Sequence, residues 1–389
     1  MIIGLLGCLI NNENMGCVAL TFSLINMLEK IAKENKANYK YYIFEVAPDE
    51  MHRKSAIEIL HLQENQIRCF DVTPLFRFRR FVHHLSVGVK SLNAINRCDY
   101  VIDLTAGDSF ADIYGQYTFD GETNVKLLVE KLGKKLILGP QTYGPFSTDK
   151  NIQKAREAIE CANLVISRDQ KSADCIASFS DKKVYVTTDL AFTLPWKVED
   201  DNPSDKIQIG INVSGLLLSD KTENTALLID LKTSYNTYIR GVIDWLLTEN
   251  RYNIHIIPHV GNDGSDYIRN FYGDQLNYCE AYSDPISAKN KISQMDIFVG
   301  ARMHATIAAF SSGVATIPTA YSRKFAGLYS NLGYPYIIDF VENTTEENIE
   351  RTIQYIREYK CLQRDVRNCK SKIEKLSSKT YDLLFDTIK

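Results

Sequence analysis

The sequence predicts an α/β protein that consists of two αβα-sandwich, Rossmann-like domains in tandem. Short apolar runs alternate with longer segments of helical periodicity along the 389 residues. The apolar runs show little alternation with polar residues, which is typical of strands buried on both faces of a parallel sheet. The alternation pauses at residues 195–206, where two prolines and a cluster of charged residues predict a linker between the domains.

Residues 1–195 are expected to form the N-terminal domain. Its predicted strands are Ile2–Ile10, Tyr41–Val46, Gln66–Asp71, Tyr100–Leu104, Lys135–Gly139, Leu164–Ser167 and Lys183–Thr187. Segments with helical periodicity lie between the strands, at Cys17–Ala32, Lys54–Leu62, Thr123–Lys131 and Lys150–Ala162.

Residues 206–345 are expected to form the C-terminal domain, and residues 346–389 one or two amphipathic helices. The predicted strands of this domain are Ile207–Val213, Asn253–Pro258, Asn277–Glu280, Ile297–Val299, Val314–Pro318 and Tyr336–Asp339. Ligands of open parallel sheets bind beyond the carboxyl ends of the strands. Two such domains that face each other would place an active site in the cleft between them, as in the GT-B glycosyltransferase layout.

Composition narrows the class of protein. The net charge of -3 and the pI near 6.2 do not indicate the basic surface that nucleic-acid binding needs. The sequence contains no apolar run of the roughly 20 residues that a transmembrane helix needs. The nine cysteines show no Cys-x-x-Cys spacing, which favours reduced thiols in a cytoplasmic protein over disulfides or a zinc site. We therefore expect no metal site.

Two terminal segments raise the question of membranes. The apolar start, residues 1–7, lacks a basic region and is interpreted as a core strand, not a signal peptide. The C-terminal segment is basic enough to contact an anionic membrane surface. Its interspersed acidic residues make a solvated helix face the more common explanation.

A candidate anion site follows the predicted strand Ile297–Val299. Arg302 and His304 fall where this strand meets a predicted helix, Met303–Phe310. Free backbone N–H groups and the helix dipole favour anions at such a position. Arg302 can clamp a carboxylate or phosphate, and His304 can deliver a proton near neutral pH. Alternatively, Arg302 forms a structural ion pair and His304 is a core histidine.

Polar residues also follow strands of the N-terminal domain. Asn14 lies in a turn before a helix, and Asp108 follows a glycine turn at the expected carboxyl edge of the sheet. Gln141 and Tyr143 lie in a loop rich in glycine and proline and could contact a sugar. Arg168 ends a further strand. A helix cap at Asp108, a plain turn around Gln141 and an Arg168 ion pair are the structural alternatives.

In the C-terminal domain, His259 and Asp263 follow the second predicted strand. A histidine and a carboxylate in one glycine-containing loop could bind a sugar or orient a base. The structural alternative is that Asp263 caps the following helix.

Together these motifs resemble the polysaccharide pyruvyl transferase family. The resemblance covers nearly the whole chain. Its motifs, in order, are Asn14-x-Gly16, Ser167-Arg168-Asp169, Gly300-Ala301-Arg302-Met303-His304 and Tyr321-x-x-Lys324. The family transfers the enolpyruvyl group of phosphoenolpyruvate (PEP) to sugar hydroxyls, forms a cyclic pyruvate ketal and has a GT-B-like fold.

The resemblance implies a role for each matching residue. Arg302 would bind the phosphate or carboxylate of PEP, His304 would be the general acid, and Arg168 and Lys324 would complete the anion site. We expect the N-terminal domain to lie on the side of the acceptor, a sugar on a lipid or nucleotide carrier. The acceptor contacts are expected from Asn14, Gln141 and Tyr143 of this domain and from His259 and Asp263 of the C-terminal domain. PEP serves as donor substrate, and the reaction needs no cofactor.

One position departs from the family pattern. The family usually has an acid directly after the Asn-x-Gly turn, and here that position is Cys17. Asp108 stands where the family usually has a glycine. We hypothesise that the acid has moved from position 17 to position 108 and that Asp108 is catalytic. Two other functions stay open: a GT-B glycosyltransferase that uses a nucleotide sugar, and a non-catalytic sugar- or anion-binding relative.

Overall fold

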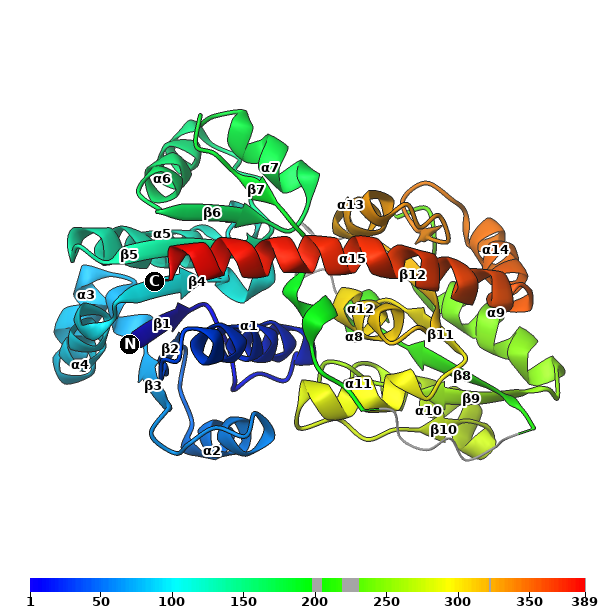
Figure 1. Ribbon diagram of the computed structural model, residues 1–389. Helices are drawn as coiled ribbons and strands as arrows, with labels where there is room; N and C mark the ends of the chain where they lie inside the picture. Colours follow the sequence, from blue (N-terminus) through cyan, green and yellow to red (C-terminus); the bar gives the residue numbers. More distant parts are fainter. Residues whose placement is uncertain (198–204, 219–230, 322, 389) are drawn as a thin grey trace. The chain divides into compact units, whose positions relative to one another are not determined.

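The computed structural model describes residues 1–197, 205–218, 231–321 and 323–388 (Figure 1). Contacts within the chain divide it into two compact units. The first unit consists of Met1–Asn12, Leu20–Leu190 and Lys375–Lys389, and the second of Glu13–Ala19 and Ala191–Glu374. Each unit contains one parallel β-sheet with helices packed against it.

The sheet of the first unit has seven strands in the order β3-β2-β1-β4-β5-β6-β7. The strands are β1 (Ile2–Leu6), β2 (Lys40–Glu45), β3 (Ile67–Asp71), β4 (Tyr100–Asp103), β5 (Lys135–Gln141), β6 (Leu164–Ser167) and β7 (Tyr185–Val186). Because β1 pairs with both β2 and β4, the strand order reverses between β1 and β4. This reversal is the topological switch point of a doubly wound sheet.

Helices cover both faces of this sheet. They are α1 (Met15–Glu34), α2 (Glu50–Ile59), α3 (Phe78–His83), α4 (Leu85–Arg97), α5 (Gln116–Lys131), α6 (Asp149–Glu160) and α7 (Gln170–Ala177). Tyr42 and Phe44 of β2 pack in one apolar cluster with α4, α5 and α6. Tyr41 points to the opposite face, where its hydroxyl donates a hydrogen bond to Glu29 of α1 at 2.6 Å.

The sheet of the second unit has six strands in the order β10-β9-β8-β11-β12-β13. They are β8 (Ile207–Asn212), β9 (Tyr252–Ile256), β10 (Asn277–Tyr278), β11 (Ile297–Gly300), β12 (Ala315–Ala320) and β13 (Ile338–Asp339). This order is that of the Rossmann fold, and its switch point lies between β8 and β11.

The helices of the second unit also lie on two faces. They are α8 (Gly215–Leu218), α9 (Tyr235–Thr248), α10 (Ser265–Tyr272), α11 (Pro285–Ser293), α12 (Met303–Ser311), α13 (Arg323–Leu332), α14 (Thr345–Arg357) and α15 (Tyr359–Thr387). Ile211 and Val299 pack with α9, α10 and α14, whereas Phe298 packs with α11 and α12. A side chain on Gly210 would lie 2.8 Å from the Phe298 ring, so only glycine allows this packing.

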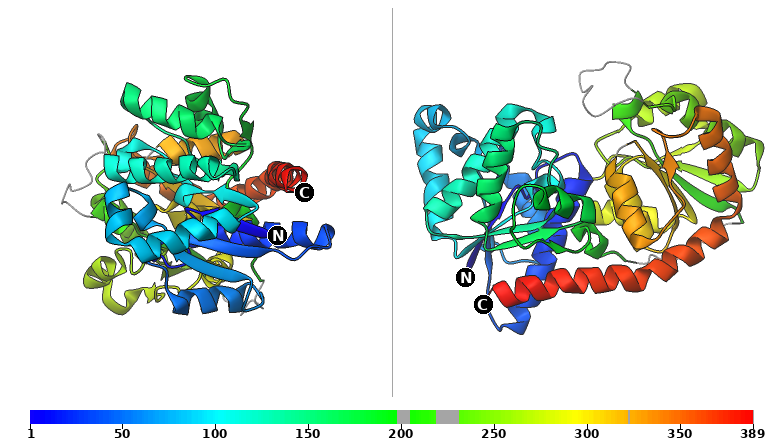
Figure 2. Two further views of the ribbon diagram at one scale, coloured as in Figure 1. Left: turned by 90° about the vertical axis from the view of Figure 1, so that its left-hand side faces the viewer. Right: turned by 90° about the horizontal axis from the view of Figure 1, so that it is seen from above.

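Two segments group differently from the expected domain limits. Residues 13–19, the start of α1, belong to the second unit. The final residues, from Lys375 onwards, belong to the first unit, and there Lys379 donates a hydrogen bond to the carbonyl of Val186 at 2.9 Å. The expected C-terminal helical segment forms α14 and α15, and α15 is one long helix (Figure 2).

Every predicted strand has a counterpart, but several are shorter than expected. The first strand ends at Leu6, not Ile10, because Gly7 adopts a positive φ of 60° and turns the chain. The N–H groups of Ile10 and Asn11 then donate to the Glu45 carboxylate instead of to a neighbouring strand. Helices α3 and α4 have no counterpart among the predicted elements.

One helix among the described residues, α1, is long and apolar enough by composition to cross a membrane. The most apolar part of it is 78% buried within the structure, as in the core helix of a globular domain.

Candidate active site

Arg302 lies at the switch point of the second sheet. It follows β11, and its backbone N–H donates a hydrogen bond to the side chain of Asn212, the last residue of β8, at 2.9 Å. The other end of the Asn212 amide donates to the carbonyl of Ile257 at 3.0 Å. The two sheet strands and the loop after β9 thus fix the backbone from which the Arg302 side chain extends.

Asp263 holds the Arg302 guanidinium in a two-pronged ion pair. Nε donates to Oδ2 at 2.8 Å and Nη2 to Oδ1 at 2.7 Å. The Arg302 side chain is 21% exposed and that of Asp263 only 2%. Burial disfavours the charge on Arg302, but Asp263 outweighs burial, so the pKa of Arg302 lies above its ordinary value. Among the described residues, none forms a hydrogen bond with Nη1, which leaves one face of the guanidinium for an anion.

Asp263 therefore does not cap the following helix. The residue before α10 is Gly264, whose backbone is left-handed and which forms no side-chain cap. Asp263 itself adopts a positive φ of 36°, and its Oδ1 also accepts a hydrogen bond from the N–H of Gly215 at 2.9 Å. The sequence left two alternatives for Arg302, a structural ion pair and an anion site. The structure shows the ion pair with Asp263, and this pair does not rule out an anion site.

His304 begins the first turn of α12 and lies against the start of α1. A side-chain carbon on Gly16 would fall 2.3 Å from Nδ1 of the His304 imidazole. Asn14 shapes this turn, because its side chain accepts a hydrogen bond from the N–H of Gly16 at 3.0 Å. Both residues group with the second unit, so the turn lies beside the strand ends that carry Arg302.

His259 joins the same group. Its carbonyl accepts a hydrogen bond from the N–H of Met15 at 3.1 Å, and Val260 forms an antiparallel bridge with Asn14. Burial, with smaller contributions from the neighbouring His304 and Arg302, lowers the pKa of His259 to about 3. His259 is therefore neutral near pH 7. Its buried Nδ1 has no hydrogen-bond partner among the described residues.

The structure thus brings Asn14, His259, Asp263, Arg302 and His304 together in one unit. The sequence motifs placed the first of these residues in the N-terminal domain. What sequence reasoning missed was the pairing of residues 13–15 with residues 259–261, since a backbone contact between distant loops leaves no local signal.

Arg168 lies at the end of β6 in the first unit and is buried. Its Nη1 donates to Asp189 at 2.9 Å, while the neighbouring Asp169 is 4.0 Å from Nε. Burial opposes the charge, but Asp189, Asp108 and Asp169 outweigh it and raise the pKa of Arg168. The guanidinium also lies against Gly107, where a side-chain carbon would be 3.4 Å from Nη1. Sequence reasoning did not single out Asp189.

Asp108 is half-buried beside this arginine. Its Oδ2 accepts a hydrogen bond from the hydroxyl of Tyr114 at 3.0 Å. The turn before it contains Thr105, Ala106 and Gly107, all with positive φ. Asp108 was predicted, as an alternative, to cap a following helix. The next helical turn starts at Asp112, and its N-cap residue is Ala111, not Asp108.

Gln141 and Tyr143 are directed into the first unit. The Gln141 amide donates to the carbonyl and the carboxylate of Asp103 at 3.2 and 3.1 Å. The Tyr143 hydroxyl contacts the carbonyls of Gly139 and Ile166 at 3.2 and 3.1 Å. Both side chains are almost fully buried, so in the structure they support the loop from inside.

Lys324 lies in the first turn of α13. Its side chain and the neighbouring Ser322 lie outside the described part of the chain. Among the described residues, no group of three or more histidine, cysteine, aspartate or glutamate side chains is arranged to hold a metal ion.

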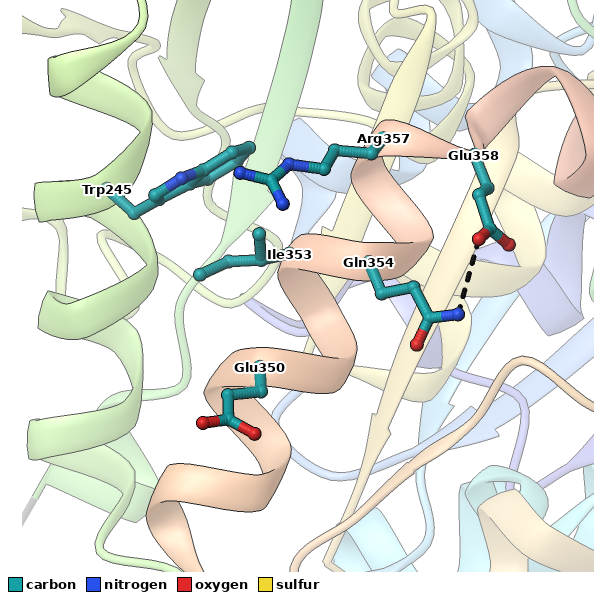
Figure 3. A pocket seen from close by; sticks show the side chains of 6 residues that line it. All are labelled: Trp245, Glu350, Ile353, Gln354, Arg357 and Glu358. Carbon is teal, nitrogen blue, oxygen red and sulfur yellow. Dashed lines mark hydrogen bonds between the residues drawn. The ribbon is translucent and has the colours of Figure 1, made fainter.

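An open hollow of about 510 Å³ lies elsewhere, between α9 and α14 (Figure 3). Arg357 lies over the ring of Trp245 there, 5.3 Å from its centre, and Gln354 donates to Glu358. Trp245 also contacts Tyr252, the first residue of β9. The hollow is therefore at the amino edge of the sheet, opposite to the edge where parallel sheets bind ligands.

A family model described as polysaccharide pyruvyl transferase matches residues 14–323 of the chain. No curated protein sequence matches it significantly. Solved structures are similar in fold. A putative UDP-N-acetylglucosamine 2-epimerase from Listeria monocytogenes has a TM-score of 0.60 at 12% identity, over 94% of this chain and 90% of that one.

Two further structures were solved with UDP. Anabaena Alr3699/HepE has a TM-score of 0.58 at 12% identity and covers 100% of this chain and 98% of its own. TcCGT1 has a TM-score of 0.58 at 11% identity, over 99% and 98%. At such identities the likeness concerns the fold, and it confirms the predicted GT-B-like class.

Proposed function

The chain belongs to the polysaccharide pyruvyl transferase family, and on that premise we propose that it transfers the enolpyruvyl group of PEP to a sugar and closes a pyruvate ketal. The reaction would serve surface-polysaccharide biosynthesis in the cytoplasm. The acceptor would be a sugar on a lipid or nucleotide carrier.

One observation supports this function above all. Arg302 donates two hydrogen bonds to Asp263, which holds its guanidinium in place, and His304 follows it at the start of α12. PEP carries a carboxylate and a phosphate, and it needs both a fixed cation and a proton donor. Arg302 supplies the cation, the free N–H groups of α12 add positive potential, and His304 supplies the donor.

The proposed chemistry begins with protonation of PEP. His304 donates a proton to the methylene carbon while a sugar hydroxyl forms a bond to the adjacent carbon, so the double bond becomes a methyl group. The hydroxyl proton passes to a base. The carbon–oxygen bond to phosphate then breaks, and the base returns its proton to the departing phosphate. A second hydroxyl attacks the same carbon, closes the ketal and gives up the proton that restores His304.

Neutral His259 suits this arrangement. If His259 were also protonated, its positive charge would repel that of Arg302. The low pKa of His259 keeps its imidazole neutral and avoids this repulsion. Asp108 is the proposed base for the acceptor hydroxyl, and Arg168 with Lys324 would complete the anion site. Arg168 is buried among carboxylates, so we propose that it mainly holds the Gly107–Asp108 turn in place. It would bind an anion only after its side chain moves away from these carboxylates.

The test is a titration with PEP. The wild type should bind PEP in the micromolar range, and Arg302→Ala should weaken binding about a hundredfold, the loss expected for a charge-assisted two-pronged contact. Arg364→Ala is the matched control, because that side chain is 68% exposed and pairs only with its neighbour Asp365. Equal PEP binding by the wild type and Arg302→Ala would contradict the proposed site.

A glycosyltransferase is the second candidate, because two structures of similar fold contain UDP. It requires a nucleotide sugar as donor. If UDP stabilises the protein against heat and PEP does not, the pyruvyl transfer proposal fails and this candidate replaces it. A protein that binds PEP but releases no phosphate with any sugar acceptor would be a non-catalytic relative.

A further inference from the structure

Residues 72–98 stand out because they contain no aspartate or glutamate. The whole chain has 48 acidic and 45 basic residues, so a basic stretch of this length departs from its average. The basic residues of the stretch are Arg77, Arg79, Arg80, Lys90 and Arg97, and two histidines, His83 and His84, add to them. These residues lie on and beside α3 and α4 at one end of the first unit (Figure 1).

The same two helices expose apolar side chains. Phe78 is 82% exposed, Val82 56%, Leu85 55% and Val89 39%. Phe78 and Val82 lie four residues apart on one face of α3, and Leu85 and Val89 lie four residues apart on one face of α4, with the non-helical His84 between the two helices. These four side chains are called the apolar stripe. Their neighbours face inward: Phe81 packs in the core cluster and closely approaches Gly88. The two helices therefore bury one face against the core and expose the apolar stripe on another.

Cations flank this stripe. Arg79 and Lys90 are exposed. Arg77 and Arg80 lie over the ring of Tyr117, at 4.6 and 5.3 Å from its centre, and Tyr117 is itself 39% exposed. An acid close to this group, Asp120, is already paired with Lys154, and Arg77 is 3.8 Å from its second oxygen. We call Phe78, Arg79, Val82, Leu85, Val89 and Lys90 the α3–α4 surface.

We propose that the α3–α4 surface docks on an anionic phospholipid membrane. Apolar and aromatic side chains on one helical stripe enter the boundary between headgroups and acyl chains, while flanking arginines and lysines contact lipid phosphates. Long basic side chains cover the edge of such a stripe with their apolar stems. The α3–α4 surface has this composition: an apolar stripe, basic residues beside it and no acidic residue among its members.

Other occupants fit less well. In a symmetric dimer the surface would face itself, so its cations would oppose one another without acids to pair with them. Nucleic acid would leave the apolar stripe without a role. Membrane docking goes beyond the proposed function and needs neither PEP nor an acceptor, although it would bring the enzyme to lipid-linked sugars.

Vesicle flotation tests the proposal with the full chain. The vesicles contain either phosphatidylcholine alone or equal parts of phosphatidylglycerol and phosphatidylcholine, and salt is varied. The wild type should float with the anionic vesicles only, and less so as salt increases. The variant Arg79→Glu/Lys90→Glu should bind at least about tenfold more weakly, since each basic residue near an anionic surface contributes to affinity.

A second variant, Phe78→Ser/Leu85→Ser, keeps the charge and should also weaken binding about tenfold, because the apolar insertion is lost. The matched control is Arg367→Glu/Lys370→Glu on α15, which makes the same charge change at two other exposed residues. It should bind as the wild type does. Thermal unfolding should be equal for all four proteins.

Three results would overturn the proposal. They are failure of the wild type to float with anionic vesicles, a loss of affinity in the control as large as in the α3–α4 variants, and normal binding by the two α3–α4 variants. If sedimentation shows a dimer that Phe78→Ser/Leu85→Ser converts to a monomer, without vesicle binding, the surface joins two copies of the chain instead. None of these results depends on PEP, so they leave the proposed reaction untouched.

Discussion

Gly16 packs so closely on His304 that a single added methyl carbon would lie 2.3 Å from the imidazole Nδ1. The backbone at Gly16 is helical and not left-handed, so the requirement for glycine arises from space alone. The start of α1 therefore fixes the position of the proposed general acid. Proton transfer depends steeply on such positioning.

Gly16→Ala should lower kcat about a hundredfold while PEP binding through Arg302 changes little. It should also reduce the free energy of unfolding by about 1–3 kcal/mol, the usual range for overpacking. The sharper measurement is the double variant. When His304→Ala is present, the imidazole ring is gone and only the Cβ of residue 304 remains, 2.7 Å from the added carbon, so adding Gly16→Ala should destabilise the protein less than it does in the wild type. Equal destabilisation in both backgrounds would mean that the two residues are not coupled.

The buried ion pair between Arg168 and Asp189 should be a major determinant of stability. The two side chains are 2% and 0% exposed. Arg168→Met leaves the Asp189 carboxylate buried without its arginine and should cost about 3–5 kcal/mol in urea unfolding. Arg364→Met removes an exposed pair, with a side chain 68% exposed, and should change stability by less than about 0.5 kcal/mol. A stable Arg168→Met that no longer binds PEP would instead favour a direct role of Arg168 in ligand binding.

His259 should make the protein sensitive to mild acid. Its pKa falls from 6.5 to about 3 on folding, mainly through burial. Between these values the unfolded chain binds a proton that the folded protein does not, so stability rises with pH. The stabilisation is complete above pH 6.5 and is lost as the pH falls, by about 2 kcal/mol at pH 5.

His259→Gln should flatten the pH dependence of urea unfolding between pH 5 and pH 7. Some slope should remain, because burial also lowers the pKa of His255 to about 4. The exposed residue His83 supplies the control, and His83→Gln should keep the full slope of the wild type. An unchanged slope in His259→Gln would show that His259 is protonated to the same extent in both states.

The sequence predicts the sheets well because their strands are short, apolar and separated by helices. Arg302 and His304 were also predictable, since a strand end and a helix start are adjacent in the chain. Asp189 was not, because it lies 21 residues from Arg168 and no local pattern links them. Helices α3 and α4 were missed because the buried face of α4 consists largely of the small residues Gly88, Ser91 and Ala94, whereas its larger apolar side chains Leu85 and Val89 are exposed.

The position of the catalytic acid can be decided with Asp108 and Cys17. Asp108 lies in the first unit, beside the charge of Arg168, whereas Cys17 groups with the start of α1 in the second. If Asp108 activates the acceptor hydroxyl, Asp108→Asn should keep PEP binding and lower ketal formation about a hundredfold or more, because an amide cannot accept the proton. Cys17→Ser should keep both if Asp108 is the base, since a thiol serves as a base only when it is ionised. Phosphate release and ketal formation are measured together with the native acceptor. Normal turnover in Asp108→Asn combined with a loss in Cys17→Ser would place the essential group at position 17 and remove Asp108 from the mechanism.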